Sequence, residues 1–86
     1  MTMKIDLHSL TLDEAIIELK LGLLESIQMD NSIVEIIHGY HGGQVLKTYL
    51  HSTQFERDMR KAGITISRLK KGSTPGSMLI KIQKGA

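Results

Sequence analysis

Two short stretches carry the residue types that could act on a phosphate group. The first, Asp6-Leu7-His8, places a carboxylate and an imidazole two positions apart, and the second, residues 38–43, combines two histidines with three glycines. A histidine can accept or donate a proton near neutral pH, and a carboxylate bonded to its other ring nitrogen fixes its tautomer. We therefore predict that Asp6, His8 and His38 are catalytic residues.

The glycine-rich stretch could bind phosphate through its backbone. Glycines adopt positive φ and let the chain approach a ligand closely, and free amides at the start of a following helix favour an anion. The spacing matches neither a Walker loop nor Gly-x-Gly-x-x-Gly, so no nucleotide cofactor site is expected. A tight connection between a strand and a helix is an equal alternative. The phosphate contacts predicted here are Gly39, Tyr40, His41, Gly42, Gly43 and, one turn into the helix, Lys47.

Several of these side chains also have a structural interpretation. A histidine at the end of a strand often only bonds to the backbone, and His38 could brace the glycine loop instead of transferring a proton. Tyr40 could stack on an unpaired base or pack against a neighbouring hairpin. His51 falls on a helical stretch away from both motifs, and we expect a surface residue there.

Charge is segregated along the chain. Residues 1–43 carry two lysines against seven carboxylates, and residues 44–86 carry nine Lys or Arg against two carboxylates. This pattern favours an anionic partner for the second half, although the two halves could also neutralise each other across the fold. Arg68, Lys70 and Lys71 are predicted to hold flanking phosphates, contacts that set affinity and carry no sequence information. Further basic residues could extend this surface, namely Arg57, Arg60 and Lys61.

Hydrophobic periodicity predicts the elements that must position these residues. Met3, Ile5 and Leu7 alternate with polar residues, as in a strand with one covered face. A capping box at Thr11 to Glu14 starts a long amphipathic helix that runs to about Met29. A strand is expected at 32–38. A helix should begin at about Gln44, pause near His51, where a second capping box occupies 53–56, and end at Gly63. Two strands at 64–70 and 77–83, joined by a hairpin loop, complete the expected elements.

The order β-α-β-α-β-β predicts an α/β fold in one domain, residues 1–86. A strand, a helix of nearly twenty residues and another strand form a parallel crossover. The first strand is polar on its second face, so helices should cover only one face of the sheet. We therefore predict a two-layer sandwich with a mixed four-stranded sheet. The carboxyl ends of the first two strands would then meet at one edge, where open α/β sheets bind ligands.

The residue inventory limits the chemistry. The absence of cysteine excludes disulfides and thiolate zinc sites, and few carboxylates fall near the motifs, so no metal site is predicted. On RNA, a neighbouring 2′-hydroxyl could attack the phosphorus between two imidazoles without a required cofactor. On DNA, water would need activation, for which a divalent cation is possible. No apolar run has the length of a signal peptide or a membrane span, so we expect a cytoplasmic protein with no membrane partner.

The two motifs resemble those of the Smr (small MutS-related) domain family. Asp6-Leu7-His8, a long amphipathic helix, Ile36-Ile37-His38-Gly39 and Val45-Leu46-Lys47 occur in the family's order and spacing over about residues 4–82. The resemblance implies a fold similar to the C-terminal domain of bacterial translation initiation factor three. It also implies nucleic-acid binding, because members bind nucleic acid and several nick DNA or cut RNA. They occur alone or attached to larger repair and ribosome-associated proteins, so ribosome association is a possible property.

The resemblance carries over position by position. The acidic residue and histidine of the first family motif fall on Asp6 and His8, and the second motif begins at His38. Four departures are present in this sequence: Ile5 replaces the usual Leu, Ser9 replaces the usual Gly, His41 lengthens the glycine loop by one residue, and Lys47 replaces a frequent Arg and loses its bidentate geometry.

Three functions follow from these observations. The first is a nucleic-acid-binding endonuclease that cleaves phosphodiester bonds in RNA or DNA by histidine acid/base chemistry. The second, motivated by the departures, is a nucleic-acid-binding module that does not cleave. The third is a protein-interaction module that uses apolar residues of the first helix or an open sheet face that includes Ile33 and Ile37.

Overall fold

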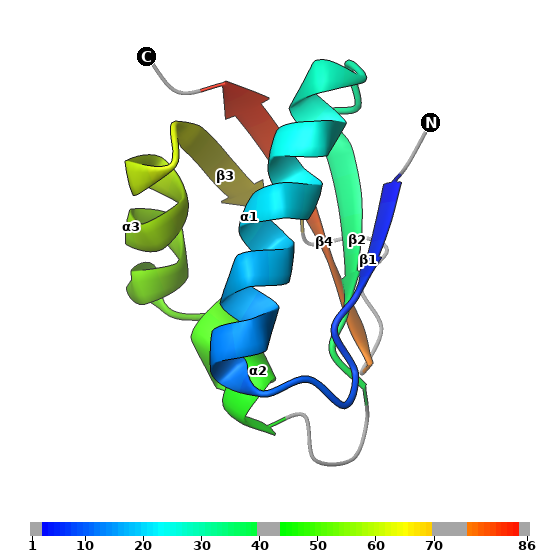
Figure 1. The fold of residues 1–86 in the computed structure, drawn as a ribbon, viewed down its shortest axis with the longest axis vertical. Coiled ribbons are helices and arrows are strands. Elements are labelled where there is room, and N and C mark those ends of the chain that lie inside the picture. The colour runs from blue at the N-terminus through cyan, green and yellow to red at the C-terminus, as the bar shows by residue number, and fades with distance from the viewer. Residues whose placement is uncertain (1–2, 40–43, 70–75, 85–86) are drawn as a thin grey trace.

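The computed structural model describes residues 3–39, 44–69 and 76–84. Its strands form one four-stranded sheet in the order β1-β2-β4-β3 (Figure 1). The strands are β1 (Met3–Asp6), β2 (Ile33–Ile37), β3 (Ile64–Arg68) and β4 (Ser77–Lys84), and the helices are α1 (Leu12–Gln28), α2 (Gln44–Leu50) and α3 (Thr53–Lys61).

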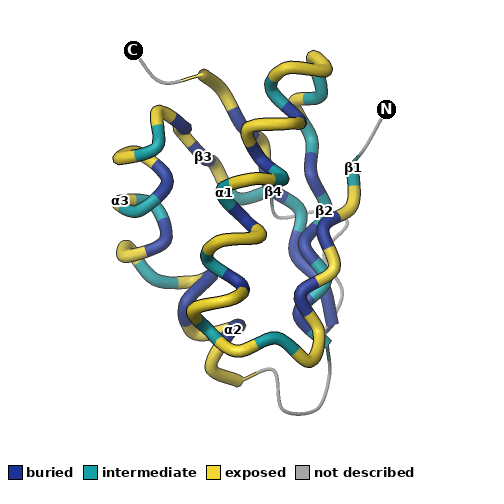
Figure 2. Tube along the Cα trace, in the orientation of Figure 1, coloured by how far each residue is buried: buried dark blue, intermediate teal, exposed yellow. Residues whose placement is uncertain are grey.

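The helices lie together on one face of the sheet (Figure 1). Figure 2 shows buried residues along the strands and on one side of the turns of α1 and α3, with exposed residues on the other turns of α1. The core is aliphatic apart from Tyr49 and Phe55, whose ring centroids are 5.6 Å apart. The predicted α/β two-layer sandwich is therefore confirmed, including the mixed sheet and the single helical layer.

Helix α1 begins with the predicted capping box. The Glu14 amide donates to Thr11 Oγ1 at 3.2 Å, and the Thr11 amide donates to Glu14 Oε1 at 2.9 Å. These bonds satisfy backbone amides that have no partner in the first turn. Further along, Gly22 lies against β1, since a Cβ there would come within 2.7 Å of Ile5 Cδ1. The missing side chain thus allows close packing of α1 on the sheet.

Strands β1 and β2 are parallel neighbours, as the sequence predicts. Asp6 pairs with Ile37 in the strand register, and the Leu7 amide donates to the Ile37 carbonyl at 2.7 Å just beyond the end of β1. The residues that follow the two strands therefore leave the sheet at the same edge. This relationship is what brings the two sequence motifs together.

The second helical region is divided into α2 and α3, and the predicted capping box between Thr53 and Glu56 is wrong. Ser52 is the N-cap residue of α3 and makes no side-chain capping bond. Its hydroxyl donates instead to the Tyr49 carbonyl at 2.6 Å. The Glu56 carboxylate is occupied by Arg68, so a local capping interaction has been replaced by a contact with a distant strand.

A left-handed glycine follows α3, as predicted. Ala62 is the C-cap residue, and Gly63 has φ of 82°, a conformation that glycine adopts without a steric penalty. The chain then enters β3, which pairs antiparallel with β4, and β4 pairs antiparallel with β2. Strand β3 therefore runs parallel to β1 at the opposite border of the sheet.

Candidate functional site

Asp6 and His8 form a polar pair at the open face of the sheet. Ile5 and Leu7 are buried, so strand alternation places the intervening Asp6 on the other side. His8 follows in the turn from Leu7 to Leu10, and both Asp6 and His8 are exposed. The Nδ1–H of His8 donates to Asp6 Oδ1, and the His8 amide donates to the same oxygen at 3.1 Å. The His8 side chain is 64% exposed, which leaves its ring available to a ligand.

The Asp6 carboxylate is held in its ionised form. The hydrogen bond from the His8 ring, followed by the bond from the His8 amide, lowers the pKa of Asp6 below its usual value. Because Asp6 occupies Nδ1, the Nε2 atom of His8 is the ring nitrogen that can meet a substrate. An imidazole held in this way can act as a general acid or base.

The turn after His8 has an unusual backbone conformation. Ser9 has φ of 69°, and the Leu10 amide donates to the Leu7 carbonyl at 3.1 Å. A left-handed conformation costs energy for a residue with a side chain and none for glycine. The glycine that is usual at this position in the family fits this geometry, and Ser9 adopts the same turn at a cost.

Gly39 brings the second motif next to the first. Its φ is 88°, and a Cβ built on Gly39 would lie 3.5 Å from the Cβ of His8. The amides of His38 and Gly39 both donate to the Gly76 carbonyl, at 3.0 and 3.1 Å. The residues that follow β2 are therefore held by Gly76, the residue before β4, and Gly39 lies beside His8.

His38 is buried, whereas His8 is exposed. It continues the buried positions Val34 and Ile36 of β2 and is only 3% exposed, so it lies on the helix-covered face. Its Nδ1–H donates to the Gly39 carbonyl at 3.0 Å. This contact has the geometry of a brace for the glycine backbone, one of the two roles that the sequence left open.

The end of α2 gathers further positive groups. Lys47 is exposed in the last turn of α2, and the amide of His51 donates to the Lys47 carbonyl at 3.1 Å. Loss of solvation, and then the charges of Arg68, Lys47 and His38, lower the pKa of His51 below its usual value. His51 is exposed, as expected, but it lies within electrostatic reach of His38. The spacing of four residues was the sequence signal for the proximity of His51 to Lys47.

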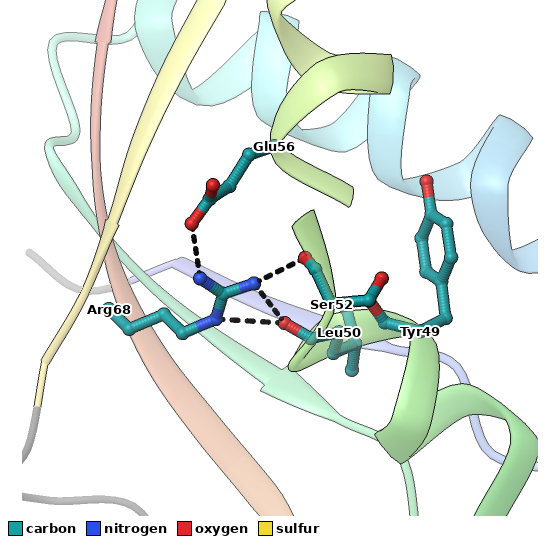
Figure 3. A network of polar contacts seen from close by, with 5 residues as sticks. All are labelled: Tyr49, Leu50, Ser52, Glu56 and Arg68. Carbon is teal, nitrogen blue, oxygen red and sulfur yellow. Dashed lines mark hydrogen bonds and ion pairs between the residues drawn. The ribbon is translucent and has the colours of Figure 1, made fainter. Parts of the chain in front are cut away.

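Arg68 is engaged by the chain itself (Figure 3). Its Nε and Nη2 donate to the Leu50 carbonyl at 2.9 and 2.7 Å, Nη2 also donates to the Ser52 carbonyl at 2.8 Å, and Nη1 binds the Glu56 carboxylate. The guanidinium thus satisfies carbonyls at the end of α2 and joins the α2–α3 corner to β3. This geometry gives Arg68 a structural role, because its guanidinium donors are already bound within the chain.

The remaining predicted site residues divide into two groups. Arg57, Arg60 and Lys61 are exposed on α3, which packs against β3 at the border of the sheet away from β1 (Figure 1). The structure therefore does not bring them to the His8 edge. The other predicted residues lie outside the described part of the chain, namely Tyr40, His41, Gly42, Gly43, Lys70 and Lys71.

Within residues 3–39, 44–69 and 76–84, no three His, Asp or Glu side chains lie close enough to hold a metal ion. In the same part of the chain, no helix combines the length and the apolar character needed to cross a membrane.

Comparisons with known proteins agree with the fold and the two motifs. The sequence model of the Smr domain matches residues 5–74, which include Asp6, His8, His38 and Gly39. The crystal structure of the Smr domain of Thermus thermophilus MutS2 is similar over 94% of this chain and 98% of that chain, with a TM-score of 0.58 and 18% sequence identity. At this identity the likeness shows the fold. A search of curated proteins gave no match. The chain belongs to the Smr domain family.

Proposed function

We propose that this Smr domain binds nucleic acid at the edge formed by His8 and Gly39, and that the Asp6–His8 pair acts on a phosphodiester bond. One observation carries the proposal: an exposed imidazole, oriented by a carboxylate, lies directly beside a glycine with positive φ. A phosphate group beside Gly39 would meet backbone without a side chain in the way. The same group would lie within reach of the His8 ring.

The chemistry suits RNA. With Nδ1 bonded to Asp6, a neutral His8 can accept a proton at Nε2 from a ribose 2′-hydroxyl. The 2′-oxygen then forms a bond to phosphorus, the bond from phosphorus to the 5′-oxygen breaks, and the leaving oxygen takes a proton. This route gives a 2′,3′-cyclic phosphate and a 5′-hydroxyl. His38 and His41 are the candidate second imidazoles, and the bond from His38 to the Gly39 carbonyl favours a bracing role for His38.

Binding beyond the reacting phosphate is assigned to lysines and to the glycine loop. Lys47 is exposed on α2, the helix that follows that loop in the sequence. We also propose Lys70 and Lys71 as contacts to flanking phosphates. Tyr40, Gly42 and Gly43 stay as loop contacts. Such contacts raise affinity in a salt-dependent manner without selecting a sequence. A cytoplasmic location and an association with ribosomes remain predictions.

A cleavage assay with three substrates tests the proposal. The purified protein is incubated with a structured RNA, its 2′-deoxy analogue and duplex DNA, each with and without a chelator, and the product ends are identified. The proposal expects cleavage of RNA with cyclic phosphate ends, insensitivity to the chelator, and no cleavage of the deoxy analogue. His8→Ala should abolish cleavage and Asp6→Asn should reduce it by about 10-fold or more.

A matched control keeps the assay specific. Asp13 is an exposed carboxylate in the first turn of α1, so Asp13→Asn changes the net charge as Asp6→Asn does without touching the His8 edge. Asp13→Asn should cleave like the unmodified protein. Unchanged turnover in a folded Asp6→Asn, His8→Ala double variant would end the catalytic proposal.

The second candidate function is nucleic-acid binding without cleavage. It is favoured by the orientation of His38, because a buried ring on the helix-covered face leaves His8 as the exposed imidazole among the described residues of the two motifs. In that case all three nucleic acids should bind with strong salt dependence, and no His8-dependent products should form.

A further inference from the structure

An apolar stripe runs along the outward face of α1. Ile17, Leu21 and Leu24 are 58%, 61% and 39% exposed, and their spacings of four and three residues place them on one line of the helix. The core-facing residues of the same helix are Ala15, Leu19 and Leu23, which are fully buried. We call Ile17, Leu21 and Leu24 the α1 stripe, and it is separate from the core that holds α1 on the sheet.

A row of carboxylates borders the α1 stripe. At about 100° per residue, Glu14, Glu18 and Glu25 fall on the same flank of the stripe, and all three are exposed. The helix carries four carboxylates and one lysine in total, a net charge of −3. An apolar surface with one acidic border is thus presented to solvent.

The α1 stripe continues into a cleft at the end of the sheet away from His8. This cleft has a volume of about 690 Å³, and its apolar lining includes Leu24, Ile27 and Ile82. Ser32 and Lys84 also line it, which places it where β2 begins and β4 ends. An apolar side chain from a partner lying along α1 could enter this cleft, so the surface has a groove at one end.

We propose that the α1 stripe binds a basic amphipathic helix of a partner protein. The apolar face of such a helix would cover Ile17, Leu21 and Leu24, and its lysines or arginines would face the glutamate row. Helices recognise apolar stripes of this spacing through anchors at similar intervals. The opposite charges would set the orientation and speed the encounter.

Charge disfavours the other occupants. Two copies of α1 facing each other would bring two helices of net charge −3 together, and like charges across an interface are costly. Membrane-surface helices carry lysine and arginine beside their apolar face, and the α1 stripe carries glutamates there instead. Nucleic-acid phosphates would be repelled for the same reason. The proposal is therefore independent of the nucleic-acid edge at His8.

A binding assay with two synthetic peptides tests the proposal on the full chain. Each peptide is a helix of about three heptads with leucine at the a and d positions; one carries lysine at the flanking positions and the other carries glutamate. The lysine peptide should bind in a salt-sensitive manner, and the glutamate peptide should bind at least about tenfold more weakly. Amide NMR signals of α1 should shift with the lysine peptide, while those of His8 and Gly39 should not.

Variants distinguish specific binding at the α1 stripe from nonspecific hydrophobic binding. Leu21→Ser should weaken lysine-peptide binding about tenfold, and Glu18→Lys should weaken it while strengthening binding of the glutamate peptide. Val45→Ser is the matched control, because Val45 on α2 is as exposed as Leu21, at 61%, and should leave binding unchanged. Because Leu21 is exposed, Leu21→Ser should lower the thermal midpoint only slightly, through the lower helix propensity of serine.

Four results would overturn the proposal. They are the absence of lysine-peptide binding, equal binding of both peptides, a dimer of this chain that Leu21→Ser dissociates, and binding to anionic lipid vesicles that Leu21→Ser abolishes. The last two would assign the α1 stripe to a second copy or to a membrane surface instead.

Discussion

A Cβ placed on Gly39 would touch His8, with 3.5 Å between the two Cβ positions. This contact joins residues that are about thirty positions apart in the sequence, and it exists because β1 and β2 are parallel neighbours. The side chain of His8 faces solvent and the backbone of Gly39 lies beside it. The proposed phosphate site depends on this adjacency.

Gly39→Ala should weaken nucleic-acid binding, and Gly63→Ala should not. Both glycines have positive φ, 88° and 82°, so each alanine should cost about 1 kcal/mol or more of stability through backbone strain. Gly63 has no atom within 4 Å of a built Cβ and lies at the other end of the sheet. Thermal unfolding would measure the loss of stability that the two variants share. A binding titration would measure the difference in their affinity for nucleic acid. Equal binding by the two variants would contradict the assignment of Gly39 to the site.

Arg68→Ala should destabilise the fold by about 2–3 kcal/mol, because it leaves the Leu50 and Ser52 carbonyls and the Glu56 carboxylate without their donor. Arg68→Lys should recover little, since one ammonium cannot reproduce the planar fork. Arg57→Ala, at an exposed position of α3, is the control and should change stability by less than about 0.5 kcal/mol. Denaturant unfolding checks all three. If Arg68→Ala leaves the free energy of unfolding unchanged but weakens nucleic-acid binding, Arg68 contacts phosphate instead.

The variant His38→Asn distinguishes the two possible roles of His38, which are bracing the Gly39 backbone and transferring a proton. An asparagine amide can replace the Nδ1–H donor to the Gly39 carbonyl, but it has no titrating ring. If His38 is a brace, His38→Asn should retain most binding and cleavage, and His38→Ala should lose both stability and binding. A folded His38→Asn variant that binds RNA normally and has lost cleavage would make His38 a catalytic residue.

Nucleic-acid binding near Lys47 should raise the pKa of His51. In the free protein, loss of solvation and the charges of Arg68, Lys47 and His38 lower this pKa, and a phosphate would offset those charges. Binding would then take up protons, so affinity should increase as the pH falls through the range below about 6.5. An NMR titration of the ring Cε1–H signals with and without a short RNA measures the shift. Lys47→Gln removes one of these charges and should raise the His51 pKa in the free protein. If saturating RNA leaves the His51 pKa unchanged, the end of α2 is not part of the binding site.

Local signals predicted much of the fold and the core of the site. The alternation of Ile5 and Leu7, the capping residues Thr11 and Glu14, and the glycine at position 63 act over a few residues, so their effects can be inferred from the sequence. The parallel crossover then required the ends of β1 and β2 to meet. The orientation of His38 was also present in the sequence, as the continuation of the buried alternation through Val34 and Ile36.

Long-range contacts decided the parts that the sequence did not predict. Glu56 has the spacing of a capping residue, but Arg68 competes for its carboxylate from β3. The contacts of Arg68 could not be predicted, because nothing in the sequence shows that the Leu50 and Ser52 carbonyls at the α2–α3 corner face β3. These contacts form only when the α2–α3 corner packs against the sheet.

The most direct test of the account is an amide NMR titration of the full chain with a short single-stranded RNA. The account predicts that the signals of His8 and Gly39 shift together, with one dissociation constant, and that Asp6→Asn and Gly39→Ala weaken this binding. Shifts confined to Arg57, Arg60 and Lys61 of α3, with His8 and Gly39 unchanged at saturation, would contradict it.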